Sequence, residues 1–93
     1  MNSTLIQYRS GAYADLEREV LAALDDGADG VVLDLDGLER LDSAEVRELI
    51  LLLRRARSQG GEMLLRASKP LVLRTLSTTG LDRVFSLGRK RAE

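Results

Sequence analysis

The sequence predicts a single α/β domain with a mostly parallel four-stranded sheet and flanking helices. Short apolar runs alternate with stretches of helical periodicity along the 93 residues, and a helix between two strands is the usual connection in a parallel sheet. A chain of this length supports one hydrophobic core. The hydrophobic content of 44% and the single Pro argue against a disordered or collagen-like chain. We assign residues 1–88 to the domain and residues 89–93 to a basic tail.

Four segments have the character of strands. The clearest is Val31–Leu35, an almost continuous run of β-branched and aliphatic residues. This pattern is typical of a strand buried on both faces of a parallel sheet. We therefore place it inside the sheet, with further strands expected over Thr4–Arg9, Glu62–Ala67 and Val84–Leu87.

Three helices are predicted from apolar residues at helical spacing. They cover Tyr13–Leu24, Ser43–Ser58 and a segment that opens at Pro70 and closes at Gly80. Leu51 and Leu52 lie off the main apolar stripe of the second helix, and we favour core packing over a partner surface for them. The residues expected in the core are Val32, Leu33, Leu35, Val46, Leu49, Ile50, Leu53, Leu64, Leu73 and Leu76.

The amino-acid composition excludes several classes of function. The chain has no Cys and no His, which excludes disulfides, thiol catalysis and ordinary zinc sites. No apolar run reaches the ~18 residues of a membrane helix and no signal-peptide pattern is present, so we expect a cytoplasmic protein without direct membrane insertion.

The charges are unevenly divided along the chain. Residues 1–48 hold 12 acidic residues and 4 Arg, whereas residues 49–93 hold 10 basic and 3 acidic residues. The basic residues gather on one helix, as Arg54, Arg55 and Arg57, and in the tail, with few aromatics for base stacking. We expect no binding of nucleic acid.

One segment resembles an enzymatic motif. Asp34-Leu35-Asp36-Gly37 is similar to the first motif of haloacid-dehalogenase-like phosphatases, in which the first Asp attacks phosphorus and the second acts as acid and base. Such an enzyme also needs Mg²⁺ held by further carboxylates and a Lys that neutralises the phosphate. Only Lys69 and Lys90 follow, and no acidic pair follows on a later strand end. We therefore favour a strand end with an Asp-Gly turn, and expect no enzymatic activity, cofactor or metal.

The turn into the second helix allows two interpretations. A phosphate on Ser43 would meet free backbone N–H groups and the positive end of the helix dipole. Asp42 and Glu45, three residues apart, also fit a capping box, which needs no further function.

Four segments together resemble, in order and spacing, the STAS domain of bacterial anti-sigma-factor antagonists. They are Val31–Leu35, Leu41-Asp42-Ser43, Gly60-Gly61-Glu62-Met63 and Thr79-Gly80-Leu81. The resemblance implies that Ser43 is the phosphoacceptor. It implies a partner-binding region made of Asp36, Asp42, Ser43, Glu45 and Arg47.

The resemblance also implies a function by partner switching. The unphosphorylated form would bind an anti-sigma factor that is a serine kinase and so free the sigma factor. The kinase would phosphorylate the antagonist and release it, and a PP2C-type phosphatase would reset it, with no cofactor bound to the antagonist. The alternative is a STAS subunit that docks on a membrane transporter's ATPase or in a stress-sensing scaffold, where Ser43 would be a contact.

The chain departs from the family pattern in three places. Glu45 and Arg47 stand where the family usually has Gly, and we expect the charge and bulk of Glu45 to slow phosphorylation, so that the unmodified form dominates. The segment before the first helix is reduced to Ser10-Gly11-Ala12-Tyr13, and little follows the last strand. Because apolar faces or sheet edges would then be uncovered, we expect a homodimer.

Overall fold

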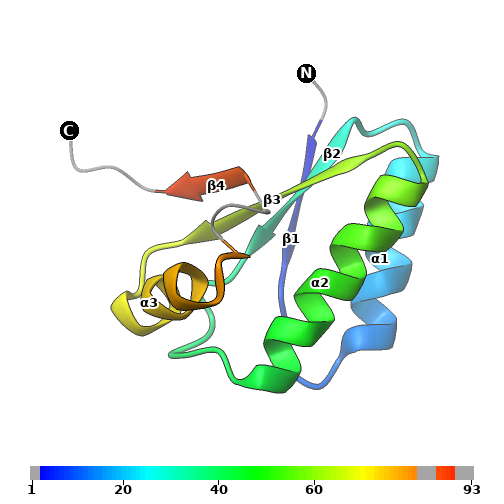
Figure 1. The fold of residues 1–93 in the computed structure, drawn as a ribbon. Helices are drawn as coiled ribbons and strands as arrows, with labels where there is room; N and C mark the ends of the chain where they lie inside the picture. Colours follow the sequence, from blue (N-terminus) through cyan, green and yellow to red (C-terminus); the bar gives the residue numbers. More distant parts are fainter. Residues whose placement is uncertain (1–2, 82–85, 90–93) are drawn as a thin grey trace.

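A computed structural model describes residues 3–81 and 86–89 (Figure 1). Strands and helices alternate in the predicted order, and none of the helices in the described ranges is long and apolar enough to cross a membrane. The elements are β1 (Ser3–Gln7), α1 (Tyr13–Asp25), β2 (Gly30–Asp34), α2 (Ser43–Ser58), β3 (Glu62–Ala67), α3 (Pro70–Thr79) and β4 (Ser86–Arg89).

The four strands form one parallel sheet in the order β1-β2-β3-β4. Each connection therefore moves one strand further in the same direction. Since crossovers between parallel strands are right-handed, three successive crossovers of this kind place α1, α2 and α3 on the same face of the sheet (Figure 1). The predicted fold class is confirmed.

The core lies between that face and the helices. Alternate strand residues point into it, with Ile6, Leu33 and Leu65 aligned across the first three strands. The helices contribute Leu16 and Val20 from α1, and further residues from α2 and α3. The buried helix residues of the second half of the chain are Leu49, Leu52, Leu53, Ala56, Val72 and Leu76.

The other face of the sheet is not covered by any helix in the described residues, and we call it the open face. Its central row is formed by Leu5, Val32 and Leu64, which are neighbours in the strand register. Leu5 is 57% exposed, and Val32 and Leu64 are half-buried. The expectation that Val31–Leu35 is buried on both faces is therefore wrong, as is the placement of Val32 and Leu64 in the core. A run of apolar residues does not distinguish one covered face from two.

The buried face of α2 also differs from the prediction. Ile50, expected in the core, is 38% exposed, and Leu51 is 39% exposed, whereas Leu52 is fully buried. The helix packs against both α1 and β3, so its inward stripe runs through Leu49, Leu52, Leu53 and Ala56. Val46 of α2 and Leu73 of α3 pack at the margin of the core and are only partly buried.

The turn from α2 to β3 explains the pair of glycines there. Gly60 has a φ of 79°, which a residue with a side chain adopts at a cost. A Cβ atom on Gly61 would overlap the side chain of Leu24 of α1. The two glycines thus let the chain reverse close against α1. The last strand, expected over Val84–Leu87, is Ser86–Arg89. Residues 84–85 of the expected strand and residues 90–93 of the expected tail lie outside the described ranges.

Tyr8 joins the first strand to α2. Its backbone N–H donates to the Asp34 carbonyl at 3.0 Å and its side chain is buried. The phenolic OH donates to Glu48 Oε1 at 2.6 Å. Burial raises the pKa of Tyr8 well above its ordinary value, and the hydrogen bond to the Glu48 carboxylate raises it further.

We predict that Tyr8→Phe lowers the free energy of unfolding by about 1–2 kcal/mol at neutral pH, because Glu48 loses its donor. Because the pKa of Tyr8 is higher in the folded state, its protonated side chain stabilises the fold. This stabilisation is complete below the unfolded pKa of about 10 and is lost as the pH rises above that value toward the folded pKa. The alkaline loss of stability should therefore be smaller in Tyr8→Phe. Urea unfolding between neutral pH and pH ~11 measures both effects.

Tyr13→Phe is the matched control, because Tyr13 is only partly buried and lies 3.5 Å from its acceptor on Glu17. It should cost much less at neutral pH. Equal costs for the two variants would contradict the role given to Tyr8.

Candidate functional site

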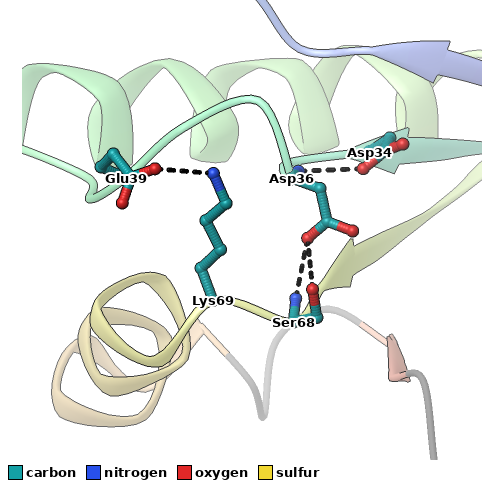
Figure 2. Close-up of polar contacts among 5 residues, drawn as sticks. All are labelled: Asp34, Asp36, Glu39, Ser68 and Lys69. Atoms are coloured by element: carbon teal, nitrogen blue, oxygen red, sulfur yellow. Dashed lines mark hydrogen bonds and ion pairs between the residues drawn. The ribbon is translucent and has the colours of Figure 1, made fainter.

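The residues that the sequence singled out lie at the carboxyl end of the sheet. There the loop that follows β2 and leads into α2 meets the loop that follows β3 (Figure 2). This edge is the usual place for binding sites in open parallel sheets, since the loops that leave the strands gather there.

Asp36 links the two loops. Its Oδ1 atom accepts hydrogen bonds from the backbone N–H of Ser68 at 2.9 Å and from the Ser68 hydroxyl at 3.0 Å, as Figure 2 shows. Lys69, the next residue, pairs with Glu39 across the same gap at 2.7 Å. The ion pair is at the surface and contributes little, so the two hydrogen bonds to Asp36 are the stronger of these side-chain links between the loops.

The Asp34-Leu35-Asp36-Gly37 segment forms the predicted strand end and turn. Asp34 Oδ1 accepts the N–H of Asp36 at 2.9 Å, and the N–H of Leu38 closes the turn on the Leu35 carbonyl at 3.0 Å. Among the residues that the structure describes, no three acidic side chains are grouped so that they could hold a metal ion. The two aspartates are thus occupied by local hydrogen bonds that shape the loop.

The first turn of α2 carries the predicted capping box. Asp42 has extended backbone geometry, and its Oδ1 accepts the N–H of Glu45 at 2.8 Å. Glu45 Oε1 accepts the N–H of Asp42 in return, also at 2.8 Å. Two backbone donors at the helix N-terminus are satisfied in this way, which defines where α2 begins.

Glu45 has a second role that the sequence did not indicate. Its side chain is only 8% exposed, and its Oε2 atom accepts the hydroxyl of Ser10 at 2.5 Å. Both carboxylate oxygens are therefore used, one within α2 and one across to the loop between β1 and α1. The expectation that the bulk of Glu45 slows phosphorylation requires an exposed side chain, whereas the capping bond turns this one inward. The expected effect of its charge stays a prediction.

Ser43 and Arg47 lie on the solvent side of the same helix. Ser43 is the first residue of α2 and is exposed, and its hydroxyl has no hydrogen-bond partner among the described residues. Arg47 is exposed one helical turn further along, and residues four apart share a helix face. The structure thus brings Asp42, Ser43, Glu45 and Arg47 together at the N-terminal end of α2. Asp36 lies apart from them, in the loop after β2, where it is hydrogen-bonded to Ser68.

Sequence reasoning missed Ser10 and Ser68, the partners of Glu45 and Asp36. Both are short polar residues in loops, and each hydrogen bond joins residues more than 30 positions apart. No local pattern predicts such a pairing. A weak signal existed for Ser68, since the loops that follow neighbouring parallel strands meet at one edge.

Comparisons with known proteins agree with the fold. A family model described as "Mlab, STAS domain" matches residues 9–88. BtrV of Bordetella bronchiseptica, whose name assigns it to the anti-sigma factor antagonists, is 34% identical over 76 residues. The match covers 82% of this chain and 66% of BtrV, so the chain spans slightly less than two thirds of that relative.

Two solved structures share the fold. An RsbS variant from Moorella thermoacetica has a TM-score of 0.71 at 26% identity, and the match covers 97% of this chain and 81% of that one. An anti-sigma factor antagonist from Mycobacterium paratuberculosis has a TM-score of 0.64 at 26% identity, covering 87% and 68%. Because the family model spans most of the chain and the architecture agrees, the chain belongs to the STAS domain family.

Proposed function

We propose that the chain is an anti-sigma factor antagonist that acts by regulated protein–protein binding. In this proposal the unphosphorylated form binds an anti-sigma factor that is also a serine kinase. Phosphorylation of Ser43 releases the complex and a PP2C-type phosphatase restores the binding form. The names of the Bordetella and Mycobacterium proteins support the antagonist role.

The observation that carries the proposal is the position of Ser43. Its hydroxyl is exposed at the start of a helix whose capping interactions are made by Asp42 and Glu45. A kinase therefore has access to the hydroxyl without unfolding the helix end. The same position lies next to backbone N–H groups and the positive end of the helix dipole, which favour a bound phosphate.

A phosphate on Ser43 would change the binding surface by charge. It adds about −1.5 to −2 charges at pH 7, beside the exposed carboxylate of Asp42 and one turn before Arg47. Such a group would repel an acidic partner surface and draw Arg47 away from a partner contact. A change of this size at one end of α2 is sufficient to lower affinity without a change of fold.

The other predicted site residues take two different roles in this proposal. Asp36 and Glu45 position the surface, since their carboxylates are bound to Ser68 and Ser10. Asp42 and Arg47 are exposed beside Ser43 and make the contacts with the partner. Replacement of Arg47 should therefore weaken binding through the contact itself, whereas replacement of Asp36 should act through the loop.

We predict that Ser43→Ala abolishes transfer of phosphate from the cognate kinase and leaves binding intact, because the methyl group keeps the surface neutral. Intact-mass analysis after incubation with kinase and ATP reads out the transfer. The control is Ser58→Ala, at the other end of α2, where the hydroxyl donates to the Arg55 carbonyl. Full phosphorylation of Ser43→Ala would contradict the assignment.

Affinity capture with the wild-type chain identifies the partner class. Recovery of a serine-kinase anti-sigma factor together with its sigma factor supports the proposal. Recovery of the ATPase of a membrane transporter, or of a stress-sensing scaffold, would instead make Ser43 a contact residue.

We predict that Glu45→Gln speeds phosphorylation of Ser43 by about two- to fivefold. The amide retains the size of the side chain and can still bond to Asp42 and Ser10, so only one negative charge is removed from the neighbourhood of Ser43. Charges a few ångströms apart in water interact by roughly 1 kcal/mol or less. Initial rates with the cognate kinase measure the effect.

Glu19→Gln on α1 removes the same charge from an exposed position and should leave the rate unchanged. If Glu45→Gln also left the rate unchanged, Glu45 would act on this site only as a helix cap.

A further inference from the structure

The open face of the sheet is a surface that the proposed function does not use. The row of Leu5, Val32 and Leu64 crosses three neighbouring strands on that face. No helix in the described ranges covers it, and Ser43 is on α2, which packs on the opposite side. Leu5 is among the most exposed large apolar side chains of the described chain. An uncovered apolar row at the centre of a sheet is typical of a face that packs against another sheet.

The charges that flank the row identify what packs there. On β3, the residues that point to the open face are Glu62, Leu64 and Arg66, in the order negative, apolar, positive. Two such strands placed face to face and antiparallel bring Glu62 of each opposite Arg66 of the other. The face is therefore complementary in charge to a second copy of itself.

The state of these two residues within one subunit agrees with such a pairing. Arg66 is half-buried and forms no ion pair with any described residue. Glu62 contacts Arg57 at 3.2 Å, but its side chain remains 54% exposed. Both groups are thus accessible from the open face. Asp34, the neighbour of Arg66 in the strand register, forms no ion pair with it and has one carboxylate oxygen on the N–H of Asp36, so Glu62 of a second copy can still pair with Arg66.

The same pattern selects one symmetry axis. In a dimer whose two-fold axis runs along the apolar row, Leu5, Val32 and Leu64 each face the same residue of the other copy. Glu62 of one copy then faces Arg66 of the other. Asp34, whose Oδ1 is turned back to the N–H of Asp36, then faces Gly30, over which lies a hollow of about 160 Å³. An axis along β2 would instead place Asp34 against its own copy, where the like charges repel.

We propose that the chain forms a two-fold homodimer by stacking the open faces of two sheets, with Glu62 of each copy paired with Arg66 of the other. The residues that define this interface lie on only three strands, so the buried area is small. Interfaces of this size associate reversibly. The dimer leaves α2 and Ser43 on the outside. It does not depend on partner switching, and either property is retained if the other is absent.

The decisive experiment is an exchange of charges between two variants. Glu62→Arg places two arginines on the open face of each copy, and Arg66→Glu places two carboxylates there. Each variant alone should sediment as a monomer at a high micromolar concentration at which the wild type sediments as a dimer. An equimolar mixture of the two should form dimers again, because each arginine then faces a carboxylate.

Two surface variants control for the change in net charge. Asp25→Arg on α1 and Arg54→Glu on α2 alter exposed residues away from the open face, and both should dimerise as the wild type does. Leu5→Lys tests the apolar row at its most exposed position and should lower the dimer fraction. Circular dichroism establishes that every variant is folded.

A wild-type protein that is monomeric at high micromolar concentration would overturn the proposal. Dimers of either single charge variant alone, or a mixture that stays monomeric, would overturn it as well.

Discussion

The buried carboxylate of Glu45 is the interaction on which the rest of the site depends. A carboxylate with 8% exposure must have hydrogen-bond donors, and Glu45 has the N–H of Asp42 on one oxygen and the hydroxyl of Ser10 on the other. The first bond fixes the residue at which α2 begins. The second ties that point to the loop after β1. As a result Ser43, one residue after the cap, is held outward at the surface.

A second constraint acts on the whole sheet. Strand order follows chain order, so every right-handed crossover deposits its helix on the same side. That side buries Leu33 and Leu65, whereas the opposite side leaves Leu5 exposed. The molecule therefore has two surfaces of different character. One is the polar first turn of α2, suited to a contact controlled by charge, and the other is the apolar open face, suited to association between copies.

Local patterns were sufficient to predict the elements and the capping box. The limits of α2 and β3 follow from residues within a few positions, such as Asp42 with Glu45 and the glycines at positions 60 and 61. Burial was predicted less well because it depends on distant partners. Periodicity allows either Ile50 or Leu52 to face inward, and only the packing of α2 against α1 decides for Leu52.

The same reason explains what was missed in the site. Glu45 was recognised as a cap, but its burial depends on Ser10, which is 35 residues away in the chain. The sequence suggested that the Glu45 side chain is exposed, whereas in the structure it is buried and joins α2 to the loop after β1. Asp36 was likewise predicted only as part of an Asp-Gly turn, whereas in the structure it accepts a hydrogen bond from Ser68 in the loop after β3.

The central claim is that the Asp42–Glu45 box holds the start of α2 rigid while Ser43 remains accessible. Amide hydrogen exchange at Glu45 tests it most directly, because the N–H groups of a helix's first turn have no partner within the helix and exchange quickly unless they are capped. The account predicts slow exchange for the Glu45 N–H, close to that of the amides of β2, and loss of this protection in Asp42→Ala. Exchange of the Glu45 N–H as fast as that of exposed loop amides in the wild type would contradict the account.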